Sequence, residues 1–326
     1  MADITGKQVT VFGGSGFLGR HLIRRLAAEG HIIRVAVRDP ERALFLKVMG
    51  KIGHIVPVAA DVRDPHSVAR AVAGSHWVVN LVGILAESGK RTFQRIHTEG
   101  AANVAKAAAL EGAQRLVHVS ALGADPTSAS AYARTKAEGE AAVRAAFAGA
   151  TILRPNVVFG PEDEFFNMFA CMARFLPMLP VLGASSPRDG GARFQPVYVG
   201  DVADAIMAAL KRDDAVGATY ELCGPEEMSA RQIMEGVLRI TGRRRLLMPA
   251  PYWLLTLQAF FLEKLPGKLL TRDQVKQLRV PKVAGAAKSL VDLGIHPTAP
   301  SAILPSYLGR FRRPSADHQP QIITPR

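Results

Sequence analysis

The fold is decided by a stretch near the N-terminus, Val9-Thr10-Val11-Phe12-Gly13-Gly14-Ser15-Gly16-Phe17-Leu18-Gly19-Arg20. Its first four residues are β-branched or aromatic and predict a buried parallel strand. Apolar residues at helical spacing follow over residues 21–28, and glycines at positions 13, 16 and 19 separate the two patterns. A strand, a glycine-rich turn and a helix in this order form the context of a dinucleotide-binding fingerprint.

Each of the three glycines has its own predicted role. Gly13 lets the chain turn sharply, Gly16 lets a pyrophosphate approach the backbone, and Gly19 lets the helix pack close to the strand. Helix N-terminal amides attract the phosphates. The spacing is G-x-x-G-x-x-G, which differs from the G-x-G-x-x-G of many dehydrogenases. A turn that only connects strand to helix is the alternative. We predict that the cofactor is bound here by Gly13, Ser15, Gly16, Phe17, Leu18 and Gly19.

Strand and helix patterns alternate over the first half of the chain. Strands are expected over residues 31–37, 55–58, 76–82, 115–119 and 150–153, with helices over 41–49, 65–73, 92–110 and 131–147 between them. Such alternation predicts an α/β fold with a Rossmann-type doubly wound parallel sheet. We expect an NADP(H)-binding core over residues 1–160. A smaller, mixed and mainly helical C-terminal lobe, interleaved with the core, is expected over 161–312, with residues 177–191 as a loop. A basic tail over 313–326 is expected to become ordered only on a partner.

Composition restricts the class of protein. The two cysteines, Cys171 and Cys223, lie far apart and indicate a reducing compartment, and no metal-ligand spacing is present, so no metal is expected. No apolar run reaches the roughly 20 residues of a membrane span. The first strand pattern begins within about six residues, so we expect neither a signal peptide nor a transit sequence. These features predict a soluble or peripheral protein.

The net charge of +13 is concentrated near the C-terminus. Residues 242–326 contain 14 Lys and Arg but only 4 Asp and Glu. This asymmetry predicts contact with an acidic protein surface or with anionic lipid headgroups. We expect no nucleic-acid partner, because the segment lacks a nucleic-acid-binding motif. A solvated basic face is the alternative.

The residues after the second and third strands determine which dinucleotide is expected. An arginine after the second strand accommodates the 2′-phosphate of NADP, whereas a carboxylate there binds the ribose hydroxyls of NAD. Arg38 comes first and Asp39, which precedes a proline, is a candidate helix cap, so NADP(H) is favoured over NAD(H). Asp61 and Val62 are candidates for the adenine, with a helix cap as the alternative role of Asp61. Residues at the end of the fourth strand, Leu81, Val82 and Gly83, are expected beside the adenosine ribose.

A second constellation follows the fifth strand. Tyr132 and Lys136 form a Y-x-x-x-K pair on one face of an expected helix, and Ser120 ends the strand before it. A nearby ammonium stabilises tyrosinate, so Tyr132 is a candidate general acid or base, with Lys136 also placed to bind the nicotinamide ribose. Ser120 is placed to hydrogen-bond a substrate oxygen.

With these residues the chain resembles the short-chain dehydrogenase/reductase superfamily, of the extended or atypical kind, over about residues 7–240. The matching segments are Leu153-Arg154-Pro155-Asn156-Val157-Val158-Phe159-Gly160-Pro161 and Phe194-Gln195-Pro196-Val197-Tyr198-Val199-Gly200-Asp201-Val202-Ala203. The resemblance implies that Pro155 borders the nicotinamide and that Val158 belongs to the same cofactor-binding segment. It implies the fold but does not by itself imply turnover.

The C-terminal part resembles a narrower family, the 39-kDa-type nucleotide-binding accessory subunits of respiratory complex I. The segments concerned are 251–262, 270–275, 292–298 and 304–308, together with the basic tail. The resemblance implies tightly held NADPH without turnover, with no catalytic residues, and partners in the peripheral arm near the quinone site. It also implies a peripheral position at the membrane, on the cytoplasmic face of the inner membrane in a bacterial counterpart or the matrix side in a mitochondrial one.

Two other functions stay open at this point. A soluble NADP-dependent reductase or epimerase would use Tyr132 as acid/base, Lys136 to lower its pKa and Ser120 to orient the substrate. Only eleven residues separate Ser120 from Tyr132, which leaves less loop for a substrate pocket than in the sugar-nucleotide epimerases. A regulator that senses the NADP(H) ratio is the third possibility.

Overall fold

A seven-stranded parallel sheet forms the centre of the computed structural model, which describes residues 6–265, 270–281, 283–285 and 287–312. The strand order is β11-β6-β5-β4-β1-β2-β3, and the pairings within this sheet are parallel. The strands are β1 (Gln8–Phe12), β2 (Ile32–Val37), β3 (Ile55–Ala59), β4 (Trp77–Asn80), β5 (Arg115–Val119), β6 (Thr151–Pro155) and β11 (Thr219–Leu222). The strand order reverses direction between β1 and β4, so the predicted doubly wound α/β fold is confirmed.

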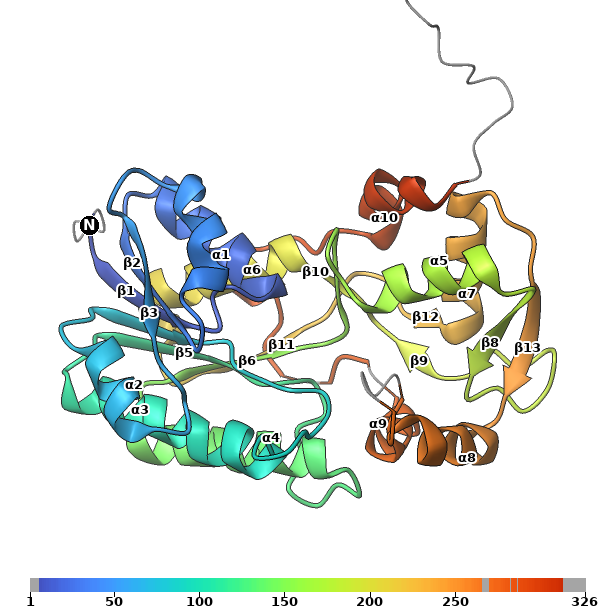
Figure 1. Cartoon of the computed structure of the whole chain (residues 1–326), viewed down its shortest axis with the longest axis horizontal. Coiled ribbons are helices and arrows are strands. Elements are labelled where there is room, and N and C mark those ends of the chain that lie inside the picture. Colours follow the sequence, from blue (N-terminus) through green and yellow to red (C-terminus); the bar gives the residue numbers. More distant parts are fainter. Residues whose placement is uncertain (1–5, 266–269, 282, 286, 313–326) are drawn as a thin grey trace, which may run out of the picture.

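Helices cover both faces of this sheet (Figure 1). One face packs against α1 (Phe17–Ala28) and α6 (Val199–Lys211), and the other against α2 (Pro65–Val72), α3 (Gly100–Leu110) and α4 (Ala131–Ala146). The central strands β1 and β4 are mostly buried and rich in valine, because helices cover both of their faces. The edge between the two layers, at the carboxyl ends of the strands, is therefore left for ligands.

A smaller C-terminal lobe lies beside the sheet domain and has its own apolar core (Figure 1). Its helices are α5 (Phe165–Phe175), α7 (Ala230–Thr241), α8 (Tyr252–Leu262), α9 (Arg272–Leu278) and α10 (Pro300–Leu308). Its strands are β8 (Met178–Leu182), β9 (Arg193–Phe194), β12 (Met228–Ser229) and β13 (Leu246–Ala250). The pair β7 (Val158–Phe159) and β10 (Val197–Tyr198) lies where the chain passes between the two bodies.

The structure differs from the sequence-based expectations in three places. The helix expected over 41–49 is a 3-10 helix, Glu41–Met49. Residues 177–191 are not only a loop, because Met178–Leu182 pairs in parallel with Leu246–Ala250. The helix expected over 92–110 begins as a π-helix, Gln94–Glu99, before it continues as α3. The expected tail over 313–326 lies outside the described residues. Within the described ranges, no helix has the length and apolar character needed to cross a bilayer.

Candidate functional site

A cleft of about 430 Å³ opens at the carboxyl ends of β1, β2, β3 and β4, beside the reversal of strand order. A cavity of this size in this position is typical of a dinucleotide site. Nine of the predicted cofactor residues line it: Gly13, Ser15, Gly16, Arg38, Asp61, Val62, Leu81, Val82 and Gly83. The other predicted residues, Phe17, Leu18, Gly19, Ser120, Tyr132, Lys136, Pro155 and Val158, are not among those that line it. The cleft therefore accounts for the adenosine and pyrophosphate half of the predicted site.

The glycine-rich turn has the close backbone approaches that its sequence predicts. Gly13 has a φ of 78°, which favours glycine, and a Cβ on Gly16 would lie 3.2 Å from the carbonyl oxygen of Gly13. A Cβ on Gly19 would lie 2.4 Å from the carbonyl oxygen of Gly14, so only glycine fits there. Gly16 precedes α1 without a side-chain cap, which leaves the first amides of the helix available to an anion.

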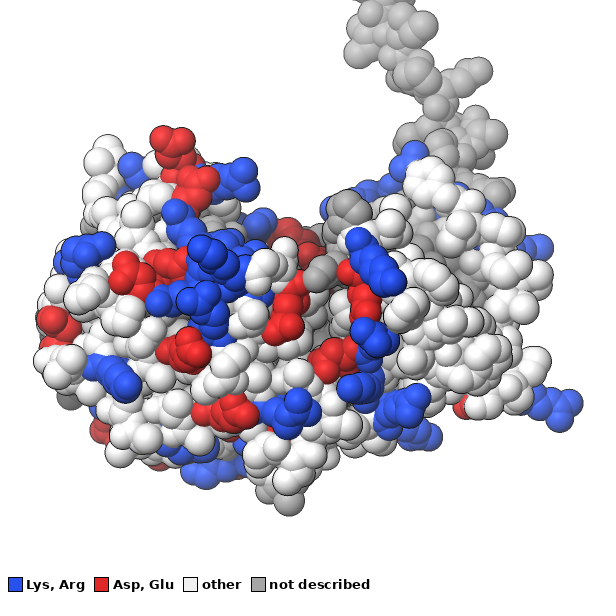
Figure 2. Space-filling model, turned by 60° about the horizontal axis from the view of Figure 1, so that its bottom comes forward, with Lys and Arg blue, Asp and Glu red and all other residues white. Residues whose placement is uncertain are grey.

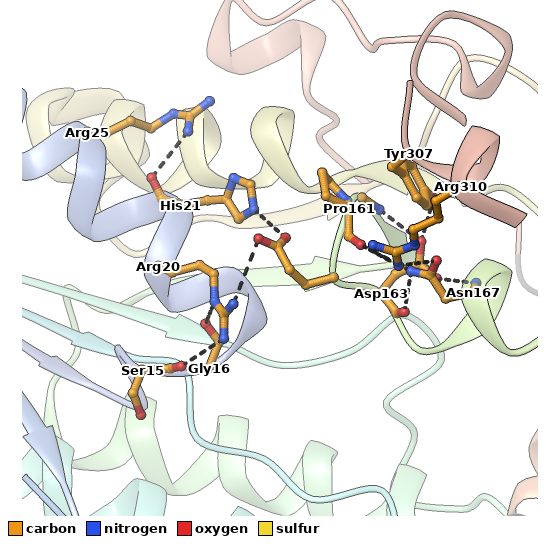
Figure 3. A network of polar contacts seen from close by, with 12 residues as sticks. Ser15, Gly16, Arg20, His21, Arg25, Pro161, Asp163, Asn167, Tyr307 and Arg310 are labelled. Carbon is orange, nitrogen blue, oxygen red and sulfur yellow. Dashed lines mark hydrogen bonds and ion pairs between the residues drawn. The ribbon is translucent and has the colours of Figure 1, made fainter. Parts of the chain in front are cut away.

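Arg20 anchors this turn and connects it to the C-terminal lobe (Figure 3). Its guanidinium donates to the carbonyl oxygens of Gly16 and Ser15, at 3.4 Å each, and lies 3.8 Å from the Glu162 carboxylate. The same carboxylate is 3.1 Å from His21 Nε2. The sequence analysis missed Arg20, although its place four residues after Gly16, one helical turn on, was available as a signal.

The next residue along the chain, Asp163, is the centre of the contact with α10 (Figure 3). Its carboxylate accepts from the backbone amides of Gly160, Phe166 and Asn167, and also from the buried hydroxyl of Tyr307 on α10. A string of polar contacts thus runs from the glycine-rich turn to the last described helices.

Four arginines line the cleft: Arg38, Arg42, Arg63 and Arg91. Arg42 pairs with Asp39 at 3.2 Å, and Asp39 also accepts from the backbone amide of Arg42 at 3.4 Å. The residue at the N-cap of the following 3-10 helix, Glu41–Met49, is Pro40, so the interpretation of Asp39 as that cap is wrong. Burial and the nearby charges of Arg38 and Arg63 lower the pKa of Arg91. Positive charge of this kind attracts an anionic ligand.

Asp61 is held by its neighbour Arg63. The Arg63 guanidinium donates to both carboxylate oxygens and its backbone amide donates at 3.0 Å, so the pKa of Asp61 is lowered. The alternative role of Asp61 as a helix cap is wrong, because Asp64 caps α2 by accepting from the amide of His66 at 3.0 Å. Sequence reasoning missed Arg42, Arg63 and Arg91, of which the first two follow the predicted Arg38 and Asp61 within a few residues.

Lys136 joins the second constellation to the cleft. A Cβ on Gly83, which lines the cleft, would lie 3.3 Å from Lys136 Nζ. The ammonium donates to the carbonyl oxygen of Val119 at 3.3 Å and lies 6.0 Å from the centre of the Tyr132 ring. Ser120 follows Val119, and its hydroxyl is buried without a hydrogen-bond partner in the described part of the chain. A buried hydroxyl of this kind suits a bound group that completes its hydrogen bonding.

Burial determines the protonation of this region. It raises the pKa of Tyr132 to about 12 and lowers that of Lys136 to about 8. Two buried histidines near Lys136 are neutral, because burial and the lysine charge lower the pKa of His97 to about 2 and that of His118 to about 3. Desolvation raises the pKa of Tyr132, so its hydroxyl is protonated, which disfavours the role of general base but leaves the role of general acid open.

Two further predicted residues, Pro155 and Val158, lie between the glycine-rich turn and the region around Tyr132. Pro155 ends β6, and its carbonyl oxygen accepts from the amide of Leu122 at 2.9 Å. Val158 packs against the apolar core that contains α1. A Cβ on Gly160 would lie 3.2 Å from the ring of Phe17, so the segment around Val158 passes close to the glycine-rich turn. Among the described residues, no group of His, Cys, Asp or Glu could hold a metal ion.

Comparison with known proteins places this geometry in a family. Residues 9–223 match the model of the NAD dependent epimerase/dehydratase family. The chain is 32% identical over 313 residues to the mitochondrial NADH-ubiquinone oxidoreductase 40 kDa subunit of Neurospora crassa, which covers 95% of this chain and 81% of the relative. The chain belongs to the family of this subunit. NADH dehydrogenase (ubiquinone) 1 alpha subcomplex subunit 9 of Mus musculus is 33% identical over 91% of this chain and 78% of its own length.

An enzyme of lipid chemistry is also a relative. A ceramide reductase of Caulobacter vibrioides is 34% identical over 74% of this chain and 73% of its own length. Among solved structures, the Escherichia coli NADPH-dependent quinone oxidoreductase with NADPH has a TM-score of 0.71 at 20% identity, covering 93% of this chain and 99% of that one. The Thermus thermophilus UDP-glucose 4-epimerase with NAD has a TM-score of 0.59 at 22% identity, covering 83% and 99%. Fold and family are those of proteins that bind nicotinamide dinucleotides.

Proposed function

We propose that this chain is an accessory subunit of respiratory complex I that holds NADPH without turning it over. The nucleotide would stabilise the folded subunit, because a ligand that binds only the folded state shifts the folding equilibrium towards it. The subunit would thereby support assembly of the peripheral arm near the membrane and the quinone site.

One observation carries this proposal. The similarity to the 40 kDa subunit extends over 95% of the chain, so it includes the C-terminal lobe as well as the sheet domain. The ceramide reductase matches over only 74% of the chain. A lobe that is shared with a subunit of a large assembly, and whose segment from residue 242 onward is strongly basic, suits contact with partners.

The choice of NADPH is supported by the arginines at the adenosine end of the cleft. Arg38 makes no ion pair within the described part of the chain, and Arg91 is a second cation beside it. The carboxylates that could bind ribose hydroxyls, Asp39 and Asp61, already have arginine partners. An arginine pair next to neutralised carboxylates fits a 2′-phosphate better than a pair of hydroxyls.

Retention without turnover is supported by the state of the Tyr132 region. Buried and with a raised pKa, Tyr132 lacks the tyrosinate that base catalysis needs, and Lys136 remains available for the nicotinamide ribose. Residues 1–160 would hold the nucleotide and residues 161–312 would contact other subunits and anionic lipid headgroups. The position would be peripheral, on the cytoplasmic face of a bacterial inner membrane or the matrix side of a mitochondrial one.

The test is extraction of source membranes in mild detergent, followed by native size separation with detection of this chain by mass spectrometry. We expect the chain to migrate with NADH:ubiquinone oxidoreductase activity, at a mass far above that of a small oligomer. Recovery only as a small species would refute the proposal.

A lipid-linked reductase is the second candidate, because the ceramide reductase is 34% identical and Ser120, Tyr132 and Lys136 are all present. In that case NADPH would transfer a hydride to a ketone of a ceramide-type lipid, and Tyr132 would give the proton to its oxygen. NADPH oxidation by the purified chain with such a ketone, lost in Tyr132→Phe, would support this candidate. No oxidation above the rate without lipid would exclude it.

A further inference from the structure

Helix α8 exposes a continuous aromatic and aliphatic surface. Trp253 is 68% exposed, Leu257 52%, Phe260 40% and Phe261 61%, and Leu265, just past the helix, is 54% exposed. Successive positions are four, three, one and four residues apart, so at about 100° per residue those on α8 fall on one broad side of the helix. We name them the α8 stripe. Large apolar side chains that are exposed together on one element indicate a binding surface, unlike those scattered singly.

The opposite side of α8 is anchored in the lobe. Leu255 and Ala259, four residues apart, are buried in a small cluster with Val275 of α9 and Ala250 of β13. The hydroxyl of Tyr252 donates to the carbonyl oxygen of Leu278 at 2.9 Å. These contacts fix the orientation of α8, with Leu255 and Ala259 packed in the lobe and the α8 stripe exposed.

Helix α9, which packs against α8, also contacts the sheet domain. The Asp273 carboxylate accepts from the Ser130 hydroxyl and the Ala131 amide at 2.7 Å each, and from the Tyr132 amide at 3.2 Å. It thus caps the start of α4, and Figure 1 shows α9 next to that end of α4. The α8 stripe is consequently held in place by both bodies of the molecule.

Cations accompany the α8 stripe. Lys264 Nζ lies 4.1 Å from the centre of the Phe260 ring, and the guanidinium of Arg272 lies 5.5 Å from the same ring. Figure 2 shows a broad uncharged area on the C-terminal lobe with lysines and arginines along its edges. Of the nearby acids, Glu263 is paired with Arg272 and Asp273 is used by α4.

We propose that the α8 stripe inserts into the headgroup region of an anionic bilayer, with α8 lying parallel to the membrane plane. This inference deepens the proposed function and rests on it for the identity of the membrane. Tryptophan and phenylalanine favour the boundary between headgroups and acyl chains, and lysine and arginine beside them attract anionic lipids. At 11 residues α8 is too short to span a bilayer, so it lies on the surface.

The combination of charge and apolar surface favours lipid over a partner protein. At the surface of an anionic bilayer, negative headgroups lie next to apolar acyl chains. The α8 stripe likewise has cations next to its aromatic rings, so the two surfaces are complementary. The excess of 14 Lys and Arg over 4 Asp and Glu in residues 242–326 adds long-range attraction to any anionic surface.

The test is flotation of the purified full chain, with NADPH, on vesicles of phosphatidylcholine with or without about one part in four of phosphatidylglycerol. Trp253 fluorescence reports the same event, because the only other tryptophan, Trp77, is 2% exposed. The variant Trp253→Ser/Phe261→Ser removes two of the three rings in the α8 stripe, and Lys264→Glu replaces a positive charge by a negative one. The matched control is Val48→Ser/Ile52→Ser, which changes side chains 88% and 104% exposed on the sheet domain.

We expect binding to the anionic vesicles with a blue shift of tryptophan emission, and weaker binding to pure phosphatidylcholine. The double ring variant should bind about tenfold more weakly or worse, with Lys264→Glu weaker as well and the control unchanged. Absence of binding by the wild-type chain, or equal binding by the ring variant, would overturn the proposal. If the ring variant fails to melt cooperatively, Leu257→Ser takes its place.

Vesicles contain no protein, so this test is separate from that of the proposed function. A chain that binds vesicles but does not migrate with complex I would refute the proposed function and retain the lipid surface. A chain that ignores vesicles, but leaves the enzyme when Trp253 and Phe261 are replaced, would show that a protein subunit covers the α8 stripe, which refutes the lipid proposal.

Discussion

Replacement of Arg38 by alanine should change the choice of nucleotide more than the fold. Arg38 follows β2 at the edge of the cleft, is exposed, and makes no ion pair in the described part of the chain. Arg42 and Arg63 are engaged with Asp39 and Asp61. Arg38 is therefore the cation that is freest to bind a 2′-phosphate, with Arg91 beside it.

The size of the effect follows from the kind of contact. A hydrogen bond to a charged group contributes about 1.5–3 kcal/mol net, and exposure of Arg38 to solvent and salt favours the lower end. A loss of about 1.4 kcal/mol corresponds to tenfold weaker NADPH binding. NADH lacks the phosphate, so its dissociation constant should stay within about threefold.

Titration of nucleotide-free protein with NADPH and with NADH, by calorimetry or by fluorescence of the reduced nicotinamide, measures both constants. The control is Arg70→Ala, an exposed arginine on α2 outside the residues that line the cleft, which makes the same change in net charge. Arg38→Ala should lower the preference for NADPH about tenfold, and Arg70→Ala should leave it unchanged. An Arg38→Ala protein that binds NADPH as tightly as the wild type would refute the assignment of the 2′-phosphate to Arg38.

Three further changes have defined outcomes. Gly19→Ala places a Cβ 2.4 Å from the Gly14 carbonyl oxygen, so it should lower the unfolding free energy by about 1–3 kcal/mol and weaken nucleotide binding. The control Gly236→Ala, with open space around its Cβ, should stabilise the protein. Equal melting temperatures of the two variants would contradict this. Tyr307→Phe removes the hydroxyl that donates to Asp163 and should lower the unfolding free energy, measured by denaturant titration, by about 1.5–3 kcal/mol. Tyr252→Phe, whose partner is a carbonyl oxygen, should lower it by about 1 kcal/mol. An unchanged unfolding free energy for Tyr307→Phe would show that Asp163 does not need this hydroxyl. His118 is neutral when folded, with a pKa lowered to about 3, so protonation favours the unfolded chain. Its effect on stability is absent above pH about 6.5, the pKa in the unfolded chain, and below it stability falls by up to about 1.4 kcal/mol per pH unit until about pH 3, where the folded form titrates. The melting temperature should therefore fall less with decreasing pH for His118→Gln than for the wild type. Equal pH dependence of the two melting temperatures would contradict the buried neutral histidine.

The sheet domain could be predicted because its determinants are local. Residues 9–28 contain strand, turn and helix in sequence, and each later strand is a short apolar run followed by a helical pattern. Parallel order then follows from right-handed crossovers. The pairing of Met178–Leu182 with Leu246–Ala250 could not be predicted this way, because it joins residues more than sixty positions apart around prolines that disfavour strands.

The candidate site was predictable where residues end strands and unpredictable where loops return to it. Arg38 and Asp61 follow β2 and β3, so their places at the cleft follow from the sheet. Arg91 reaches the same cleft from a segment without periodic pattern, which no spacing rule places. Asp61 could be predicted as a site residue, but its ion pair with Arg63 depends on side-chain geometry that residue types do not specify.

The measurement that tests the central claim most directly is the nucleotide content of the assembled enzyme before and after turnover. An affinity tag on this chain would purify the particle from native membranes, NADH and ubiquinone would be supplied, and the nucleotide would then be extracted and identified. We predict NADH:ubiquinone oxidoreductase activity in the captured particle, with NADPH that is bound in proportion to this chain and still reduced after many turnovers. Captured protein without that activity, or NADPH that is oxidised or lost as the enzyme turns over, would contradict the account.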